Sequence, residues 1–325
     1  MDSLTRTLPA SWFCSEPLYQ LERKGVFQKS WHLLGPVTRF QDRSKKVKYE
    51  IAQTTLIVEN RSPESDGIGK DGIVVYAEDQ SIEIKSHFTP SGLLFATLST
   101  KAPDFDDYFT GLEDLINKVD FSKLPHRRSI SYEGKFNWKT MIDGFQECLH
   151  CQYTHPTFTA QYPPTTYLVT NHVNFSRHLS DPSKTTTSDG LFLYFFPICT
   201  LNVYGGGMSS FRTCPSTKPG VARMEFDYYH AGTDEEFEKY YKFVRQVALE
   251  DFELCERAQM NLESGVYGEG ILNPIKENGV AFYQGRVKEM VYRQHEEDQK
   301  ERAEMERMED KCSGQEVNSV EVPVK

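Results

Sequence analysis

Cysteine, positive charge and long apolar runs are all scarce in this 325-residue chain. Its seven cysteines are an odd number, so a disulfide framework that pairs all of them is excluded. Lys and Arg total 37 against 47 Asp and Glu, and phosphate binding needs clustered cations, so nucleic acid and membranes are not expected partners. No apolar run approaches the ~20 residues of a membrane span, and the first residues lack a signal-peptide core. We therefore expect a reducing, cytoplasmic environment.

The chain is long enough for two domains at roughly 150 residues each, and its patterns predict an α+β organisation. Helical spacing of apolar residues is found at 16–31, 109–119, 137–150, 234–262 and 279–308. Strand-like segments lie at 46–60, 73–76, 92–98 and 128–132, with several antiparallel strands expected between 171 and 230. Turn-forming residues at 62–72 predict a surface loop, and 102–107 reads as a connector between the two parts.

The most informative segment places a carboxylate, two cysteines and two histidines within residues 147–155. Cys148 and Cys151 have the spacing of half a zinc site or of a redox dithiol. The other cysteines offer no second close pair for a structural zinc, and the motif lies toward the end of a helical pattern, where a thioredoxin-like dithiol would instead open a helix. Glu147 and His150 match half of a di-iron site, but no second Glu-x-x-His occurs. We interpret the two cysteines as buried packing residues or as weak groups beside the ligands.

The remaining interpretation makes His150 and His155 two imidazole ligands of a mononuclear metal. Two histidines and one carboxylate, with open positions opposite, suit Fe(II) oxygen chemistry. Taken alone, the histidine pair is equally typical of two structural histidines.

The helical segment 234–262 supplies a third ligand candidate, because its apolar stripe passes through Asp251. A buried carboxylate is costly unless it is paired or bound to a metal. The alternative is a salt bridge to Arg245 or Arg257, whereas Glu250 and Glu253 fall off the stripe and are predicted to be solvated.

These motifs carry a resemblance to a known family. The segment NWK-x3-D-x3-E-C-x-H-C-x3-HP, from residue 137, resembles the iron-site segment of Rieske non-haem iron oxygenase large (alpha) subunits. The branch that acts on choline, glycine betaine and carnitine is the most similar, and VALEDFELCERAQ at 247–259 is a second matching motif. The resemblance implies His150, His155 and Asp251 as iron ligands, and Glu147 as a bridge residue toward a neighbouring subunit. It also implies a helix-grip (START/Bet v 1-like) catalytic domain.

The chain departs from that family at the iron–sulfur cluster. A Rieske [2Fe–2S] cluster is bound by C-x-H and C-x-x-H motifs. No cysteine occurs between Cys14 and Cys148, and residues 58–98 contain one histidine, His87. We therefore expect no [2Fe–2S] cluster. The expected organisation is a cluster-less, β-rich Rieske-domain remnant at 1–105, an iron-binding catalytic domain at 106–312 and a loose tail at 313–325.

The function expected from these features is an Fe(II)-dependent oxygenase that acts on a small organic molecule. It would use dioxygen, with electrons from an oxidisable substrate such as a phenol or enol or from an external reductant. The oligomeric state stays open, with a homo-oligomer as one assembly. Two alternatives stay open: a metal-dependent hydrolase, lyase or decarboxylase, and an inert ligand-binding homologue. Glu147 and Asp143 are the candidate catalytic residues, Asp143-Gly144 replacing the Glu-Asn implied by the resemblance. The expected pocket residues are Phe145, Tyr153, Phe196 and Tyr204.

Overall fold

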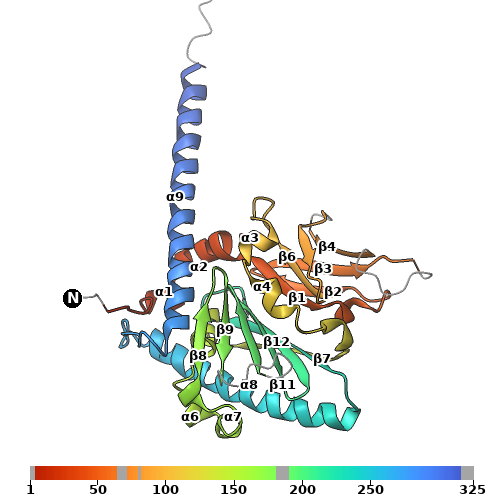
Figure 1. The fold of residues 1–325 in the computed structure, drawn as a ribbon. Coiled ribbons are helices and arrows are strands. Elements are labelled where there is room, and N and C mark those ends of the chain that lie inside the picture. The colour runs from red at the N-terminus through yellow and green to blue at the C-terminus, as the bar shows by residue number, and fades with distance from the viewer. Residues whose placement is uncertain (1–3, 64–71, 80–81, 181–189, 316–325) are drawn as a thin grey trace, which may run out of the picture.

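A seven-stranded antiparallel sheet is the centre of the computed structural model, which describes residues 4–63, 72–79, 82–180 and 190–315 (Figure 1). Its strand order is β7-β13-β12-β11-β10-β9-β8. The strands are β7 (His126–Gly134), β8 (Leu168–Asn171), β9 (Phe175–Leu179), β10 (Leu191–Phe195), β11 (Cys199–Tyr204), β12 (Gly207–Pro215) and β13 (Ala222–His230). These strands confirm the antiparallel strands predicted between 171 and 230. They form there because alternating residues and closely spaced turns favour antiparallel pairing.

Two smaller sheets of three strands each are built from the N-terminal part, with orders β1-β6-β5 and β2-β3-β4. The strands are β1 (Trp31–Pro36), β2 (Val47–Ile51), β3 (Thr54–Asn60), β4 (Ile73–Ala77), β5 (Ser86–Phe88) and β6 (Leu93–Thr97). The single strand predicted at 46–60 is therefore a hairpin. Its turn contains Ala52 and Gln53, which have φ values of +50° and +67°. Most of the loop predicted at 62–72 lies outside the described residues.

Short helices connect the sheets. They are α1 (Ser11–Cys14), α2 (Glu16–Glu22), η1 (Arg23–Phe27), η2 (Val37–Phe40), α3 (Phe105–Tyr108), α4 (Leu112–Ile116), η4 (Phe121–Lys123), α5 (Trp138–Phe145), α6 (Cys151–Thr154), α7 (Pro156–Thr159) and η5 (Pro164–Thr166). The helix predicted at 109–119 is wrong as one element, because Gly111 takes a φ of +81° between α3 and α4. The helix predicted at 137–150 stops at Phe145.

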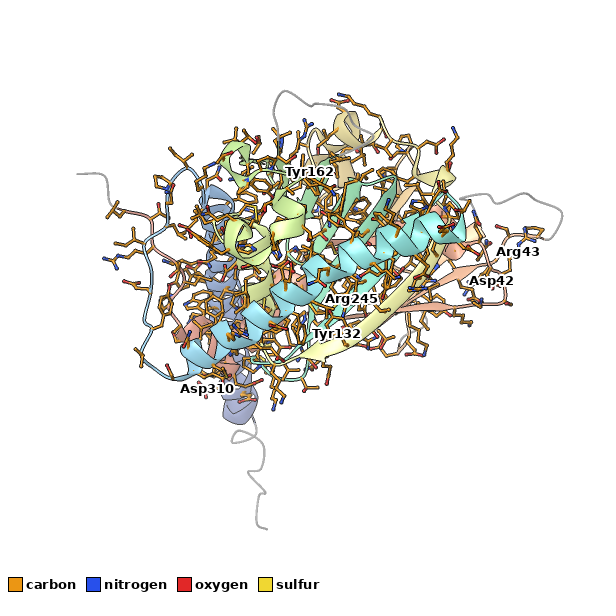
Figure 2. The ribbon with its side chains drawn as sticks, turned by 90° about the horizontal axis from the view of Figure 1, so that it is seen from below. Asp42, Arg43, Tyr132, Tyr162, Arg245 and Asp310 are labelled. Carbon is orange, nitrogen blue, oxygen red and sulfur yellow. A yellow bond between two sulfur atoms is a disulfide. The ribbon has the colours of Figure 1, made fainter. Side chains whose placement is uncertain are left out.

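Helix α8 (Asp234–Glu263) crosses one face of the large sheet, as Figure 2 shows from below. A capping box starts it: the Thr233 hydroxyl accepts from the Glu236 amide at 3.3 Å, and the Glu236 carboxylate accepts from the Thr233 amide at 2.7 Å. Its buried side chains are Phe237, Tyr240, Val244, Cys255 and Gln259. This face holds the helix against the sheet and fixes the position of Asp251.

Helix α9 (Asn278–Gln315) begins against the body of the protein, and its second half projects away from it (Figure 1). The packed half lies against α2 and η1. The approach is close at Gly25, where an added Cβ would stand 2.7 Å from the Gln294 Cβ atom. Within the described residues, no helix combines the length and apolar character needed to cross a bilayer.

A fully buried ion pair joins the N-terminal part to the helix before the histidine motif. The Lys139 ammonium lies 2.7 Å from a Glu22 carboxylate oxygen, and both side chains are inaccessible to solvent. The Trp138 indole donates to the other oxygen at 2.8 Å. Helix α5 is therefore anchored to α2, because either charge would be costly to bury alone.

Candidate metal centre

Three side chains from two distant segments converge at one point. The Nε2 atoms of His150 and His155 are 3.2 Å apart. One Asp251 carboxylate oxygen lies 2.9 Å from the His155 Nε2 atom and 3.3 Å from the His150 Nε2 atom. A metal ion bound about 2.1 Å from three ligand atoms at right angles separates those atoms by about 3 Å. The donor set and its spacing therefore fit a facial triad for a divalent metal.

Short helices bring the two histidines to the same side. Helix α5 ends at Phe145, and His150 is the N-cap of α6. His155 separates α6 from α7 and has φ −118° and ψ 65°, outside the helical region. Pro156 then starts α7, where its fixed φ is tolerated. The chain thus turns at each histidine, and both rings face Asp251 on α8.

The outer nitrogens of both rings contact carboxylates. The His150 Nδ1 atom is hydrogen-bonded to Glu147, and the His155 Nδ1 atom lies 2.7 Å from a Glu250 oxygen. Such partners fix a ring's orientation and leave Nε2 for the metal. The prediction that Glu250 is merely solvated is therefore wrong. The signal for this role in the sequence was that Glu250 directly precedes Asp251. The two carboxylates contact the two nitrogens of the His155 ring.

The salt bridge considered for Asp251 is formed with neither arginine in the described structure. Arg245 donates to the Tyr132 hydroxyl at 2.8 Å and lies over that ring, with the two residues labelled in Figure 2. Arg257 is 3.5 Å from Glu253 on the exposed side of α8. The partners of Asp251 are the two histidines.

Hydrogen bonds couple the protonation of the three candidate ligands. Burial lowers the pKa of His150, but hydrogen bonds to Asp251 and Glu147 outweigh it and raise the pKa to about 10. Burial raises the pKa of Asp251, yet the two histidines bring it down to about 2. A bound divalent cation would take the place of these protons, since an imidazole must be deprotonated at the nitrogen that ligates a metal.

Cys148 and Cys151 form a disulfide across the motif, with an S–S distance of 2.01 Å. Both side chains are buried, as predicted, but the rejection of a redox pair is contradicted. The argument from helix position failed because α5 ends before Cys148 and a new helix begins at Cys151. In the described residues, Cys14, Cys199, Cys214 and Cys255 are free thiols.

A cavity of about 100 Å³ opens beside the three candidate ligands. Seven aromatic rings belong to its wall: Phe145, Phe158, Tyr167, Phe192, Tyr204, Phe211 and Phe226. Phe145 and Tyr204 therefore lie where the sequence predicted. The other two predicted pocket residues are outside the described wall. Tyr153 is 83% exposed because α6 turns it outward, and Phe196 is fully buried in the core.

Asp143 and Glu147 line a second cavity, of about 410 Å³, on the other side of His150 and Asp251. Asp143 accepts hydrogen bonds from the Tyr283 hydroxyl and, at 2.6 Å, from the Gln284 amide. Burial raises the pKa of Asp143 to about 7, although those two hydrogen bonds oppose the shift. Two hydrogen bonds thus fix the position of the Asp143 carboxyl, which can accept a proton. It shares a cavity with His150 and Asp251, and neither of these is among its described hydrogen-bond partners.

Asp143→Asn is expected to stabilise the protein more at pH 8 than at pH 5. The ordinary pKa of the carboxyl is 3.8 and its folded value is about 7, so the folded state binds more protons between these values. The unfolding free energy therefore falls as pH rises through that window. The advantage of the neutral amide should grow by about 1–2 kcal/mol between the two pH values, measured by urea unfolding. An advantage equal at both would contradict the assignment.

The sequence profile of the ring hydroxylating alpha subunit (catalytic domain) matches residues 121–178 and 163–293, together more than half of the chain. The chain belongs to this family. The ring hydroxylating alpha-subunit match includes the histidine motif, the large sheet, α8 and the start of α9.

Relatives of this ring hydroxylating alpha-subunit homologue include oxygenase components of known enzymes. The carnitine monooxygenase oxygenase subunit of Acinetobacter baumannii is 28% identical over 61% of this chain and 59% of its own length. That of Escherichia coli is 22% identical over 85% of this chain and 91% of its own. The chain thus spans about three fifths of the length of the first relative.

Solved structures share the fold. The quaternary ammonium Rieske monooxygenase CntA has a TM-score of 0.74 at 17% identity, covering 88% of this chain and 96% of its own. Naphthalene 1,2-dioxygenase from Rhodococcus sp. has a TM-score of 0.61 at 14% identity, with 88% and 94% coverage. The resemblance stated from the motifs is therefore confirmed.

Proposed function

We propose that this chain is a mononuclear non-haem Fe(II) oxygenase that acts on a small organic molecule. The observation that carries the proposal is the convergence of His150, His155 and Asp251, whose ligating atoms lie within 3.3 Å of one another beside a cavity. The chemistry that bound Fe(II) supplies at such a donor set is dioxygen activation. Glu147 and Glu250 hold the two rings so that both Nε2 atoms face the same point.

We also propose that the enzyme works without a Rieske cluster of its own. The cysteine-free stretch from residue 15 to 147 offers none of the thiolates that a [2Fe–2S] centre needs. His87, the histidine of residues 58–98, lies 3.3 Å from Glu113 and stacks on Phe105. On this proposal, residues 1–105 are a cluster-less remnant, 106–312 a helix-grip catalytic domain in which the large sheet packs on α8, and 313–325 a tail.

The aromatic wall supports a narrower proposal for the substrate. Relatives act on carnitine or glycine betaine, each of which carries a carboxylate. No Lys or Arg belongs to the cavity wall over the residues described, so a substrate carboxylate pointing away from the metal would be buried without a counter-charge. The wall instead suits an apolar or methylated ammonium group through ring faces.

Asn202 adds a polar requirement at that wall. Asn202 belongs to the cavity wall, and its Oδ1 atom is buried and has no hydrogen-bond partner among the described residues. A buried acceptor without a donor is costly, so a substrate hydroxyl or N–H would be favoured there. We propose a small neutral or cationic substrate that carries one such donor. Choline, an ammonium with a hydroxyl and no carboxylate, is the first probe.

Anaerobic Fe(II)-loaded protein given choline and a reductant, then air, is expected to consume one dioxygen per product formed. The oxygen electrode gives the uptake, and mass spectrometry gives a product heavier by one oxygen atom. The same assay with glycine betaine should give less product, since its carboxylate lacks a partner.

The competing metal-dependent hydrolase or lyase is tested in the same protein. Turnover of the probe panel by Zn(II)-loaded protein without oxygen would favour that reaction class. Uptake equal to that of metal-free protein across neutral and cationic probes would end the oxygenase proposal.

A further inference from the structure

The Cys148–Cys151 disulfide spans the metal-ligand candidate His150. Both cysteines line the small cavity together with the three ligands. The Cys151 sulfur is also within 4.8 Å of a ring nitrogen of His150 and of His155. A two-electron redox group therefore sits directly against the proposed metal centre.

Cys148 also borders a second hollow. Cys148 lines a groove of about 180 Å³, whose remaining wall is Leu149, Gln152, Pro164, Thr165, Tyr167 and Lys276. Lys276 is fixed at this groove by the carbonyls of Thr165 and Tyr167, at 3.3 and 3.1 Å. Cys148 thus borders an outer groove and the inner cavity, whereas Cys151 borders the cavity with the metal ligands.

Oxygenation has an electron requirement that matches this couple. Placing one atom of dioxygen in a C–H bond and releasing the other as water consumes two electrons and two protons. Two thiols release that number of electrons and protons when they join in one S–S bond. Substrate, dioxygen and dithiol therefore balance with hydroxylated product, water and disulfide.

We propose that Cys148 and Cys151 are the internal electron donor of this centre. In the dithiol form they deliver two electrons toward the metal site and close to the disulfide. An external dithiol, entering at the outer groove, attacks the Cys148 sulfur; the S–S bond breaks, Cys151 leaves as the thiol and Cys148 is held in a mixed disulfide. The second external thiol then attacks its partner sulfur, which releases Cys148 as the thiol and leaves the external pair as the new disulfide. The inference rests on the proposed oxygenase function. In this chain the cysteine pair would replace the electron donor that the cysteine-free N-terminal part cannot hold.

The test needs no identified substrate, because dioxygen alone accepts the same two electrons and becomes hydrogen peroxide. The protein is reduced with dithiothreitol, freed of reductant without oxygen, loaded with Fe(II) or Zn(II), and exposed to air. The Fe(II) form is expected to lose two thiols per chain as the 148–151 disulfide returns. Its rate should exceed that of the Zn(II) form by at least about tenfold. Peptide mass spectrometry locates the bond, and peroxide is counted in parallel.

Variants separate the inference from the proposed function. Cys148→Ser and Cys151→Ser should each abolish two-electron peroxide formation, whereas Cys14→Ser, at an exposed free thiol, should behave like wild type. Thermal melting by circular dichroism checks that each variant is folded. A thiol count on the chemically reduced wild-type protein gives a measurement that does not depend on the serine variants. Equal oxygen uptake by folded serine variants and wild type would overturn the dithiol donor and leave the oxygenase standing. Absence of iron-dependent disulfide return in folded wild-type protein would also overturn the dithiol donor, whereas the oxygenase proposal is decided by the separate assay with substrate probes.

Discussion

His155→Ala and Asp251→Ala are expected to lose stoichiometric iron. Each removes one of three atoms that lie within 3.3 Å of one another, and two ligands cannot define the triad. Since loss of an outer-shell partner alone costs about 10–100-fold in metal affinity, loss of a ligand should cost more than about 100-fold. The measurement is iron per chain after Fe(II) loading and desalting without oxygen.

The matched control is Glu253→Ala. Glu253 lies on the same helix as Asp251 but is 72% exposed and pairs with Arg257, so iron content should equal that of wild type. Glu250→Gln should fall between the two, because it weakens the hold on the His155 ring without removing a ligand. Full iron in both alanine variants would place the metal elsewhere.

Lys139→Met is expected to lower the unfolding free energy by about 3–5 kcal/mol, because it leaves a buried carboxylate without its cation. Both Lys139 and Glu22 have no exposed side-chain surface, and their contact distance is 2.7 Å. The Trp138 indole continues to donate to Glu22 but cannot balance its charge. Urea unfolding at neutral pH measures the change.

Lys123→Met is the control for that loss. Lys123 pairs with Asp120 at 3.0 Å, but its side chain is 80% exposed, so the change should stay within about 1 kcal/mol. An equal loss of unfolding free energy in the two lysine variants would mean that the buried Lys139–Glu22 pair stabilises the fold no more than an exposed pair does. Glu22→Gln should also destabilise, since it leaves the buried ammonium without its charge.

Periodicity predicted the large sheet and α8, because these elements have long, regular faces. It did not predict the breaks. The hairpin at Ala52 and Gln53 depends on a non-glycine turn with positive φ, which the continuous β-branched pattern conceals. The end of α5 at Phe145 was missed because the apolar spacing continues beyond it into a segment held by tertiary contacts.

The three ligand candidates were predicted from spacing, since each lies on a pattern that can be counted along the chain. Their surroundings were not. Tyr283 reaches Asp143 from 140 positions away, and such contacts leave no local signature. The disulfide was missed because it depends on the turn between α5 and α6 rather than on cysteine spacing alone.

The buried Lys139–Glu22 pair has an evolutionary consequence. Glu22 belongs to a region without cluster ligands, yet its charge is needed to bury a cation in the helix that leads to the histidines. A descendant that discarded this region would leave that cation stranded. Shortening the chain from its N-terminal side is therefore constrained by a charge in the helix before the histidines, because that helix depends on the N-terminal part as a structural component.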